Sequence, residues 1–358
     1  MYTQGEKDFQ KYLNKLDKKS RKKLDSLFDQ FCKGLIGIAA IKNYLEANKI
    51  RSFKDLGVDG TLRDRISKLL DNVYDLVRDN SEKAWDGAKQ SHIKEVADSI
   101  KGFPVYHQYY AEHAPDTGSA LREKWMMKKS RFNLSSRIWK TEMLGQIEAV
   151  IQVAFAERWS NTQVSQQLKK YLKEPDRLYR RIRDKHTGKL KLSKRASDYH
   201  PGRGVNRSSY KNMMRMILNE RNLAYRRSAF FMMQIDDTIT GQRISLSNNH
   251  TLNGKPFVDI CDYAQGLYPK DFYWDGWHVN CRCIRTYVLM TRDEMSQKIK
   301  AIMRGESPST IKVKMIDKIP VKFQEWSIQH SESLGRLSRL PNYIEYNEKY
   351  RNILMGAA

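Results

Sequence analysis

The sequence predicts an α+β fold that is predominantly α-helical. Three observations lead to this prediction: long stretches with apolar residues at three- and four-residue spacing, two capping-box patterns, and a change of period after Asp237. With 358 residues, 40% of them apolar, the chain is long enough for two or three domains with real cores.

Residues 1–100 are predicted to be a helical N-terminal region. Two runs have the spacing of amphipathic helices. They are Leu13, Leu16, Leu24, Leu27, Phe28, Phe31 and Leu35, followed by Leu62, Ile66, Leu69, Leu70, Val73 and Val77. The basic run at 18–23 is interpreted as an exposed helix face.

Residues 101–132 are predicted to be a connecting segment, because the stretch from Gly102 to Gly118 is rich in aromatic residues, proline and glycine. Residues 133–176 are predicted to form an antiparallel helical pair, with Asn133 capping the first helix. Ser160 and Gln163 have the spacing of a capping box and open the second helix. Pro175 ends it, because a proline inside a helix removes a hydrogen bond and clashes with the preceding turn.

Residues 177–207 are predicted to be a basic, flexible arm. Twelve Lys or Arg residues stand between Arg177 and Lys211, against only two acidic residues, and glycines and prolines disfavour regular structure. Such an arm can follow a phosphate backbone, and the alternative is a solvated linker between domains. The candidate DNA-binding residues are Arg177, Arg180, Arg181, Arg183, Lys185, Lys189, Lys191, Lys194, Arg195, Arg203 and Arg207.

Residues 208–290 are predicted to form a small mixed α/β domain, and the unit as a whole is placed near 205–290. Ser208 or Ser209 caps a long helix, in which the polar Asn219 and Glu220 are interpreted as a solvent-exposed face. Short strands are expected at 243–246 and 283–290, with Gly, Asn and Pro between them.

Residues 291–358 are predicted to be a C-terminal helix and tail. Thr291 and Glu294 form a second capping box, which opens a helix that reaches about Arg304. The tail carries Phe323, Trp326, Leu334, Leu337 and Tyr343. These residues are apolar enough to pack, either on this chain or on another.

The charge balance favours a polyanionic partner, and the alternative is a soluble protein with a solvated basic surface. Lys and Arg number 65 against 41 Asp and Glu, which leaves a net charge of +24, and cations that neutralise phosphates release condensed counterions. The polar N-terminus does not have the apolar segment of a signal peptide, and no run approaches the ~20 apolar residues that span a bilayer. We therefore expect folding in a reducing cytoplasm and no membrane partner.

Three of the four cysteines lie close to one histidine in the sequence. His278, Cys281 and Cys283 form an H-x2-C-x-C pattern, and Cys261 stands upstream. Sulfur and imidazole are ligands that zinc prefers, so these four residues are a candidate structural zinc site. Two alternatives remain: Cys283 is a buried strand residue beside a hydrogen-bonded turn, or His278 and Cys281 form a nucleophilic pair facing a pocket.

These residues belong to a stretch that resembles the phage Mu protein F-like domain of minor head and head morphogenesis proteins, in the variety carried by Bacteroidota phages and prophages. The resemblance covers about residues 130–290. It is carried by His278-Val279-Asn280-Cys281-Arg282-Cys283, by the segments at 247–250, 259–262 and 267–270, and by the upstream segments at 199–202, 208–212 and 219–226. Many relatives have threonine in place of Asn219.

The resemblance implies a virion protein present in few copies near the portal vertex, assembled in the host cytoplasm, with portal and capsid proteins and double-stranded DNA as partners. It implies no catalytic residues and no small-molecule substrate. The alternative is a metal-dependent nuclease or hydrolase, or a toxin-like transferase carried by a phage. No H-E-x-x-H, P-loop or G-x-S-x-G motif supports that alternative.

Overall fold

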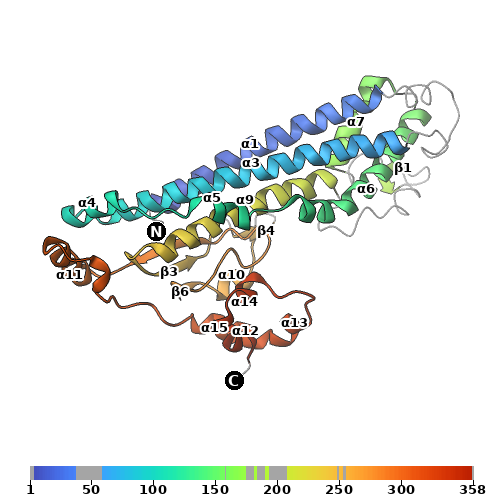
Figure 1. Ribbon diagram of the computed structural model, residues 1–358. Helices are drawn as coiled ribbons and strands as arrows, with labels where there is room; N and C mark the ends of the chain where they lie inside the picture. The colour runs from blue at the N-terminus through green and yellow to red at the C-terminus, as the bar shows by residue number, and fades with distance from the viewer. Residues whose placement is uncertain are drawn as a thin grey trace. The chain divides into compact units, whose positions relative to one another are not determined.

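The computed structural model describes residues 4–37, 59–157, 159–174, 181–183, 190–192, 208–247, 250–252 and 255–356. The protein is predominantly helical and carries a small antiparallel sheet, so the predicted α+β class is confirmed (Figure 1). Among these residues, no helix combines the length and apolar character that crossing a membrane requires.

The first half of the described chain is helical. Its elements are α1 (Gln4–Ile36), α3 (Asp59–Ser99), α4 (Pro104–Glu112), α5 (Gly118–Trp125), α6 (Lys129–Ala156), α7 (Asn161–Lys173) and α9 (Ser209–Ile235), with the short strands β1 (Arg181–Arg183) and β2 (Leu190–Leu192) before α9.

Short strands and helices then alternate. The elements are β3 (Ile239–Ser245), β4 (Thr251–Leu252), β5 (Lys255–Pro256), α10 (Ile260–Tyr263), β6 (Gly266–Pro269), β7 (Ile284–Leu289), α11 (Arg292–Met303), the 3-10 helix η1 (Pro308–Thr310), α12 (Val321–Gln329), α13 (Ser331–Gly335), α14 (Asn342–Glu345) and α15 (Glu348–Met355).

The chain divides into two compact units. Unit 1 comprises residues 1–13, 81–126 and 219–358, and unit 2 comprises residues 14–80 and 127–218. Neither unit is a single stretch of chain, because α1, α3 and α9 each supply residues to both.

Unit 2 is built around an apolar core in which the predicted stripes meet. Phe28, Cys32, Ile66 and Val73 are buried there together with Leu168. The Ser160 capping box is confirmed, since the Ser160 hydroxyl accepts from the Gln163 N–H and the Gln163 side chain accepts from the Ser160 N–H. The periodicity of apolar residues therefore predicts this half of the fold well.

Helix α3 continues well beyond Val77, the last residue of the predicted stripe. The polar Asn80 is no obstacle, because its side chain donates to the Leu76 carbonyl and accepts from the Ser20 hydroxyl in a buried position. Beyond it, Trp85 is buried in unit 1. A polar residue that finds partners along and across helices does not end a helix.

Two predictions in the middle of the chain are wrong. The stretch 102–118 is not only a connection, since α4 occupies much of it: Pro104 opens the helix, where its missing N–H costs nothing, and Tyr106 and Tyr110 are buried. Asn133 does not cap α6, which begins at Lys129; Phe132 is buried within the helix and Asn133 points to solvent.

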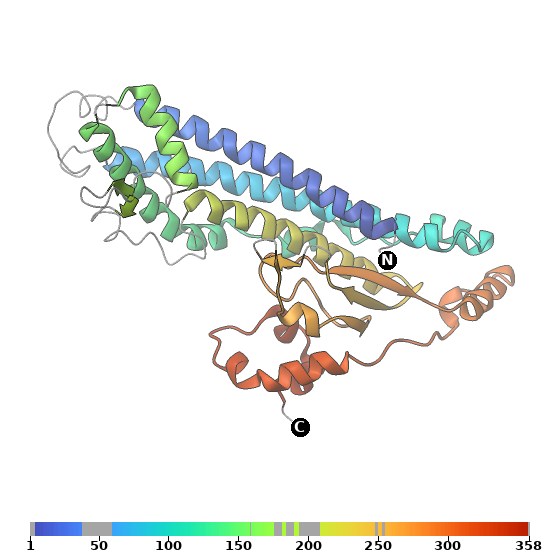
Figure 2. The ribbon, with the colours of Figure 1, turned by 180° about the vertical axis from the view of Figure 1, so that it is seen from behind.

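The sheet of unit 1 has the strand order β6-β3-β7, and both pairs are antiparallel. β3 and β7 confirm the two predicted strands, with shifted ends. Figures 1 and 2 show the C-terminal half of α9 along one side of this sheet and the tail helices on the other side. The Thr291 capping box and the helix that it opens, α11, are also confirmed.

The tail packs on this chain. Phe323, Leu334 and Tyr343 are buried in one cluster with Trp277 and Tyr268 of unit 1. Leu337, by contrast, is 49% exposed. The end of the described chain therefore completes the core beneath the sheet of unit 1.

A buried polar network joins α3, α4 and the start of β3 within unit 1. His92 Nε2 and the Tyr110 hydroxyl both lie 2.8 Å from Asp236 Oδ2, and the Thr238 N–H donates to Asp236 Oδ1 at 2.8 Å. Burial works against ionisation of Asp236, but the hydrogen bonds from His92 and Thr238 outweigh it and lower its pKa below 3.8. The carboxylate therefore organises this corner of unit 1.

Candidate functional site

Cys261, His278, Cys281 and Cys283 come together in unit 1, and we call them the cysteine–histidine cluster. Cys261 lies on α10, whose first turn is capped by Asp259. The other three belong to the loop from β6 to β7, where the Cys281 N–H closes a turn on the His278 carbonyl at 3.0 Å. The fold thus brings together residues that lie up to twenty-two positions apart.

The atoms that could bind a metal face one another. Cys261 Sγ lies 3.1 Å from His278 Nε2 and 3.8 Å from Cys281 Sγ. Cys283 is buried in the same cluster of side chains as Cys261 and Cys281. The three cysteines are buried and His278 is partly exposed. Cys261, His278 and Cys281 therefore have the arrangement of a metal-binding group.

The neighbouring thiols shift each other's pKa. The hydrogen bonds that the Cys261 thiol donates towards Cys281 and Cys283, together with burial, raise the pKa of Cys261. Burial opposes ionisation of Cys281, but hydrogen bonds from Cys261 and Cys283 and the charge of Arg226 lower its pKa. One thiolate in the cluster is thus stabilised at the expense of its neighbours.

Two acidic residues and a second histidine border the cluster. Asp259 Oδ2 lies 3.3 Å from His278 Nε2, and Asp259 Oδ1 lies 3.5 Å from His250 Nε2. Asp262 Oδ2 is 3.2 Å from the same His250 nitrogen. Asp259 already accepts from the Cys261 N–H at 2.7 Å, so it orients α10 as well as the histidines.

Arg226, on α9, fixes the loop through its carbonyl groups. Its guanidinium donates to the carbonyls of Asp275, Cys281 and Cys283 at 3.1, 2.7 and 3.0 Å and stacks on Trp274 at 4.5 Å. Gly276 leaves room for it: φ is +128° there, and a Cβ would lie 2.6 Å from Arg226 Nη1. The arginine acts as an internal scaffold, because its donors are used within the fold.

The next residue, Arg227, forms a buried ion pair. Its Nη2 lies 3.2 Å from Asp275 Oδ2, and both side chains are at most 8% exposed. Tyr273 and Asn342 also donate to this carboxylate, at 3.0 and 2.8 Å. Asp275 thereby joins α9 to the loop and to the tail.

Asn219 is a site residue that sequence reasoning missed. Its Oδ1 accepts from the Asn280 N–H at 3.1 Å, and Asn280 has a positive φ of 60°. Asn219 is half-buried and Glu220 is buried. The interpretation of these two positions as a solvent face is therefore wrong, because α9 packs on the loop with that face.

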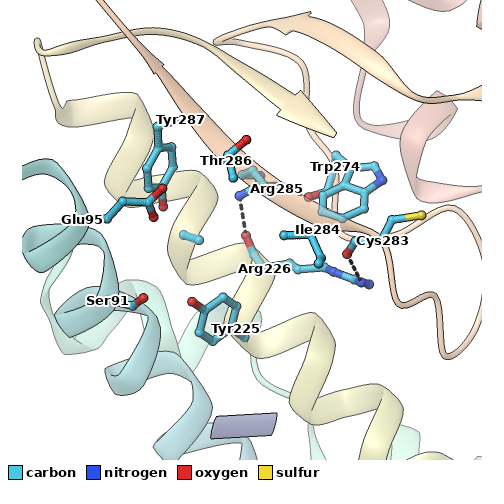
Figure 3. A pocket seen from close by; sticks show the side chains of 11 residues that line it. Ser91, Glu95, Tyr225, Arg226, Trp274, Cys283, Ile284, Arg285, Thr286 and Tyr287 are labelled. Carbon is cyan, nitrogen blue, oxygen red and sulfur yellow. Dashed lines mark hydrogen bonds between the residues drawn. The ribbon is translucent and has the colours of Figure 1, made fainter. Parts of the chain in front are cut away.

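A small cavity lies beside the cluster, between α3, α9 and β7 (Figure 3). Ser91, Glu95 and Tyr225 face Arg285 across it, and Arg285 donates to the Arg226 carbonyl at 3.0 Å. Burial lowers the pKa of Arg285 to about 10. The cavity measures about 30 Å³, room for roughly two water molecules and not for a substrate.

The nucleophilic alternative does not fit this geometry. Cys281 is fully buried, and the thiol that lies beside His278 Nε2 belongs to Cys261. Neither of these two cysteines lines the cavity described above. A nucleophile needs access to its substrate.

Most of the predicted basic arm lies outside the described residues. Within 177–207 the structure describes only β1 and β2, which pair antiparallel with Ile182 opposite Lys191. The candidate DNA-binding residues Arg177, Arg180, Lys185, Lys189, Lys194, Arg195, Arg203 and Arg207 fall outside the described part, whereas Arg181, Arg183 and Lys191 lie on these two strands.

A lysine-lined hollow in unit 2 was not expected from the sequence. Lys33 on α1 and Lys169, Lys170 and Lys173 on α7 surround a hollow of about 680 Å³. Asp29 pairs with Lys33 and Lys169 at 2.9 and 3.1 Å and offsets part of this charge. The cations are brought together by α1 and α7, which no local pattern could indicate.

Comparison with protein families, with curated proteins and with solved structures found no match.

Proposed function

We propose that the protein is a minor head protein of a tailed bacteriophage, a virion component that acts in head morphogenesis near the portal and contacts the packaged DNA. The observation that carries the proposal is the framework around the cysteine–histidine cluster. Asn219 and Arg226 come from one segment of the Mu F-like resemblance and bond the other, at Asn280, Cys281 and Cys283. The segments 219–226 and 278–283, which both carry the resemblance, thus pack against each other.

The framework suits a structural role better than a catalytic one. Arg226 and Asn219 bond backbone groups of the loop, and Arg227 is paired with Asp275. The cavity beside them is too small for a substrate. Portal and capsid proteins are the partners that the resemblance implies, and particles assembled in the host cytoplasm are where we expect the protein.

DNA contact is supported by charge. The net charge is +24, and the arm at 177–207 concentrates positive residues directly after α7. The lysines around the hollow beside α7 add a second group of cations in unit 2. Non-specific binding to double-stranded DNA requires only such charges, placed along a surface that can follow phosphates.

Association with phage particles tests the proposal that the protein is a component of the head. Particles from cells that carry this gene within its phage genome are purified on density gradients, treated with nuclease and analysed by quantitative mass spectrometry. We expect peptides of this chain at a few copies per particle, alongside portal and major capsid proteins. Their absence from mature particles and from precursor heads would overturn the proposal.

A titration of duplex DNA binding against salt concentration tests the proposal that the arm contacts DNA. If six arm charges meet phosphates, log K falls with log salt at a slope of about −5. A variant with the arm's Lys and Arg replaced by Gln should bind weakly and show a shallow slope. The matched control neutralises the five basic residues between Lys18 and Lys23 on α1 and should keep the slope. A slope that is the same in both variants would contradict a DNA-binding arm.

A further inference from the structure

We infer that Cys261, His278, Cys281 and Cys283 form a structural zinc site that fixes the loop between β6 and β7 to α10. The inference goes beyond the proposed function and does not depend on it, because a structural zinc ion stabilises a loop whatever the function of the protein is. It rests on the distances that join Cys261 to His278 and to Cys281, on the orientation of the histidine and on the buried surroundings of the three thiols.

The distances match a tetrahedral ion. Zinc holds cysteine sulfur at about 2.3 Å and histidine nitrogen at about 2.05 Å, so a tetrahedral site separates two sulfurs by about 3.8 Å, and a sulfur and a nitrogen by about 3.6 Å. Cys261 Sγ and Cys281 Sγ are 3.8 Å apart, and Cys261 Sγ is 3.1 Å from His278 Nε2. Of these two distances, the first already matches and the second has to open by about 0.5 Å.

The histidine is oriented as a ligand. His278 Nδ1 lies 3.0 Å from the carbonyl oxygen of Val279, which can only accept, so this contact favours the tautomer in which Nδ1 carries the proton. In that tautomer Nε2 offers its lone pair to the metal, and Nε2 is the nitrogen that faces Cys261 and Asp259. A zinc-bound histidine usually donates its other ring N–H to a carbonyl or a carboxylate, which fixes the orientation of the ring.

The surroundings compensate the charge of the site. Three thiolates on a divalent ion leave one net negative charge in a buried position. Arg226 supplies a buried cation next to Cys281 and Cys283, where it bonds both carbonyls. We assign Cys283 as the fourth ligand, because it is buried in the same cluster as Cys261 and Cys281 and stands two residues after Cys281.

Asp259 is outside the ligand set in this assignment. Its Oδ1 accepts from the Cys261 N–H, and its carboxylate lies between His250 and His278. Asp259 therefore orients a ligand, and its replacement by Asn keeps the acceptor at the start of α10. This makes Asp259→Asn an informative control.

Metal analysis of the full chain tests the inference. The protein is purified under reducing conditions, exposed to equimolar zinc, desalted and analysed for metal. We expect about one zinc per chain in wild type, near zero in Cys261→Ala, Cys281→Ala and Cys283→Ala, and a strongly reduced content in His278→Ala. Cys32→Ala, which removes a buried cysteine of unit 2, and Asp259→Asn should both keep the full content.

Cobalt substitution of the wild-type protein gives a readout that needs no variant to fold. Cobalt in a tetrahedral site with three thiolates gives sulfur-to-metal charge-transfer bands and intense visible bands, which equimolar zinc should abolish. Near-zero zinc with a featureless cobalt spectrum would overturn the inference. So would a Cys261–Cys281 disulfide that persists in protein purified under reducing conditions, or full zinc content in Cys281→Ala.

Discussion

The four cysteines divide between two environments. Cys32, in unit 2, is surrounded by leucine and phenylalanine side chains of the apolar core, and burial raises its pKa to about 12. Cys261, Cys281 and Cys283, in unit 1, are also buried but lie beside one another, next to His278 and Arg226. Burial alone therefore does not assign a role to a cysteine; its neighbours do.

The same contrast holds for the two regions as wholes. The core of unit 2 is a continuous set of apolar side chains presented by long helices. The loop between β6 and β7 is held by charged and polar side chains that bond backbone groups. We therefore expect the stability of unit 2 to fall when core side chains lose volume. The stability of the loop should fall when it loses hydrogen-bond donors, hydrogen-bond acceptors or charged side chains.

The largest expected effect is loss of volume in unit 2. Phe28 is fully buried and packs edge-on against Tyr210, with ring centroids 5.1 Å apart. Phe28→Ala should destabilise unit 2 by about 3–5 kcal/mol in urea unfolding. Chelator should not change this loss. A loss well below 1 kcal/mol would show that the apolar core does not hold this unit.

A change of similar size is expected in unit 1 from loss of charge instead of volume. Arg227→Met leaves the buried Asp275 carboxylate without its ion-pair partner, which should cost about 3–5 kcal/mol. The double variant Arg227→Met, Asp275→Asn removes the unpaired charge and should be more stable than the single one. If both are equally unstable, packing of the arginine stem determines the loss.

The Asp236 network gives a pH-dependent effect. The pKa of Asp236 is lowered by folding, so its contribution to stability is present above pH 3.8 and is lost as the pH falls through the lower folded value. Asp236→Asn should therefore lower the unfolding temperature at neutral pH, and the difference from wild type should shrink below pH 4. A difference that stays constant down to pH 2 would contradict this role.

The bond from Asn280 to Asn219 predicts a smaller, local effect. Asn219→Ala leaves the Asn280 N–H without its acceptor, at a cost of about 1–3 kcal/mol. Hydrogen exchange at the Asn280 amide should accelerate, whereas Asn219→Thr, which retains an oxygen, should lose less. Unchanged exchange in Asn219→Ala would mean that the loop does not depend on α9 here.

The smallest effect should be the same in both regions. Ser160 in unit 2 and Thr291 in unit 1 cap helices through the same reciprocal pair of hydrogen bonds. Replacing either by Ala should cost about 1 kcal/mol, as measured by urea unfolding. A clear difference between the two would show that one of these helix ends is held by other contacts.

Features that depend on residues close together in the chain could be predicted from the sequence. Apolar spacing predicted α1 and the first half of α3, the two predicted capping boxes open α7 and α11, and β3 and β7 lie where strands were expected. Residue types alone also selected the cysteine–histidine cluster as a unit.

Features that depend on distant backbone groups could not be predicted. Arg226 bonds carbonyls 49 to 57 residues away, and carbonyls are common to every residue, so no sequence pattern marks them. Asn219 looked solvent-exposed because its acceptor role depends on a turn at Asn280. The same limit applies to α4. Its residues Tyr106 and Tyr110 are buried against side chains from distant parts of the chain, which no local pattern indicates.

Deletion of the gene from its phage is the most direct test of the central claim that this protein acts in head morphogenesis. Heads are counted by electron microscopy and their packaged DNA is measured, with and without the wild-type gene supplied in trans. The account predicts that the deletion lowers the yield of DNA-filled heads and that the supplied gene restores it. A normal yield of full, infectious particles from the deletion phage would contradict the account.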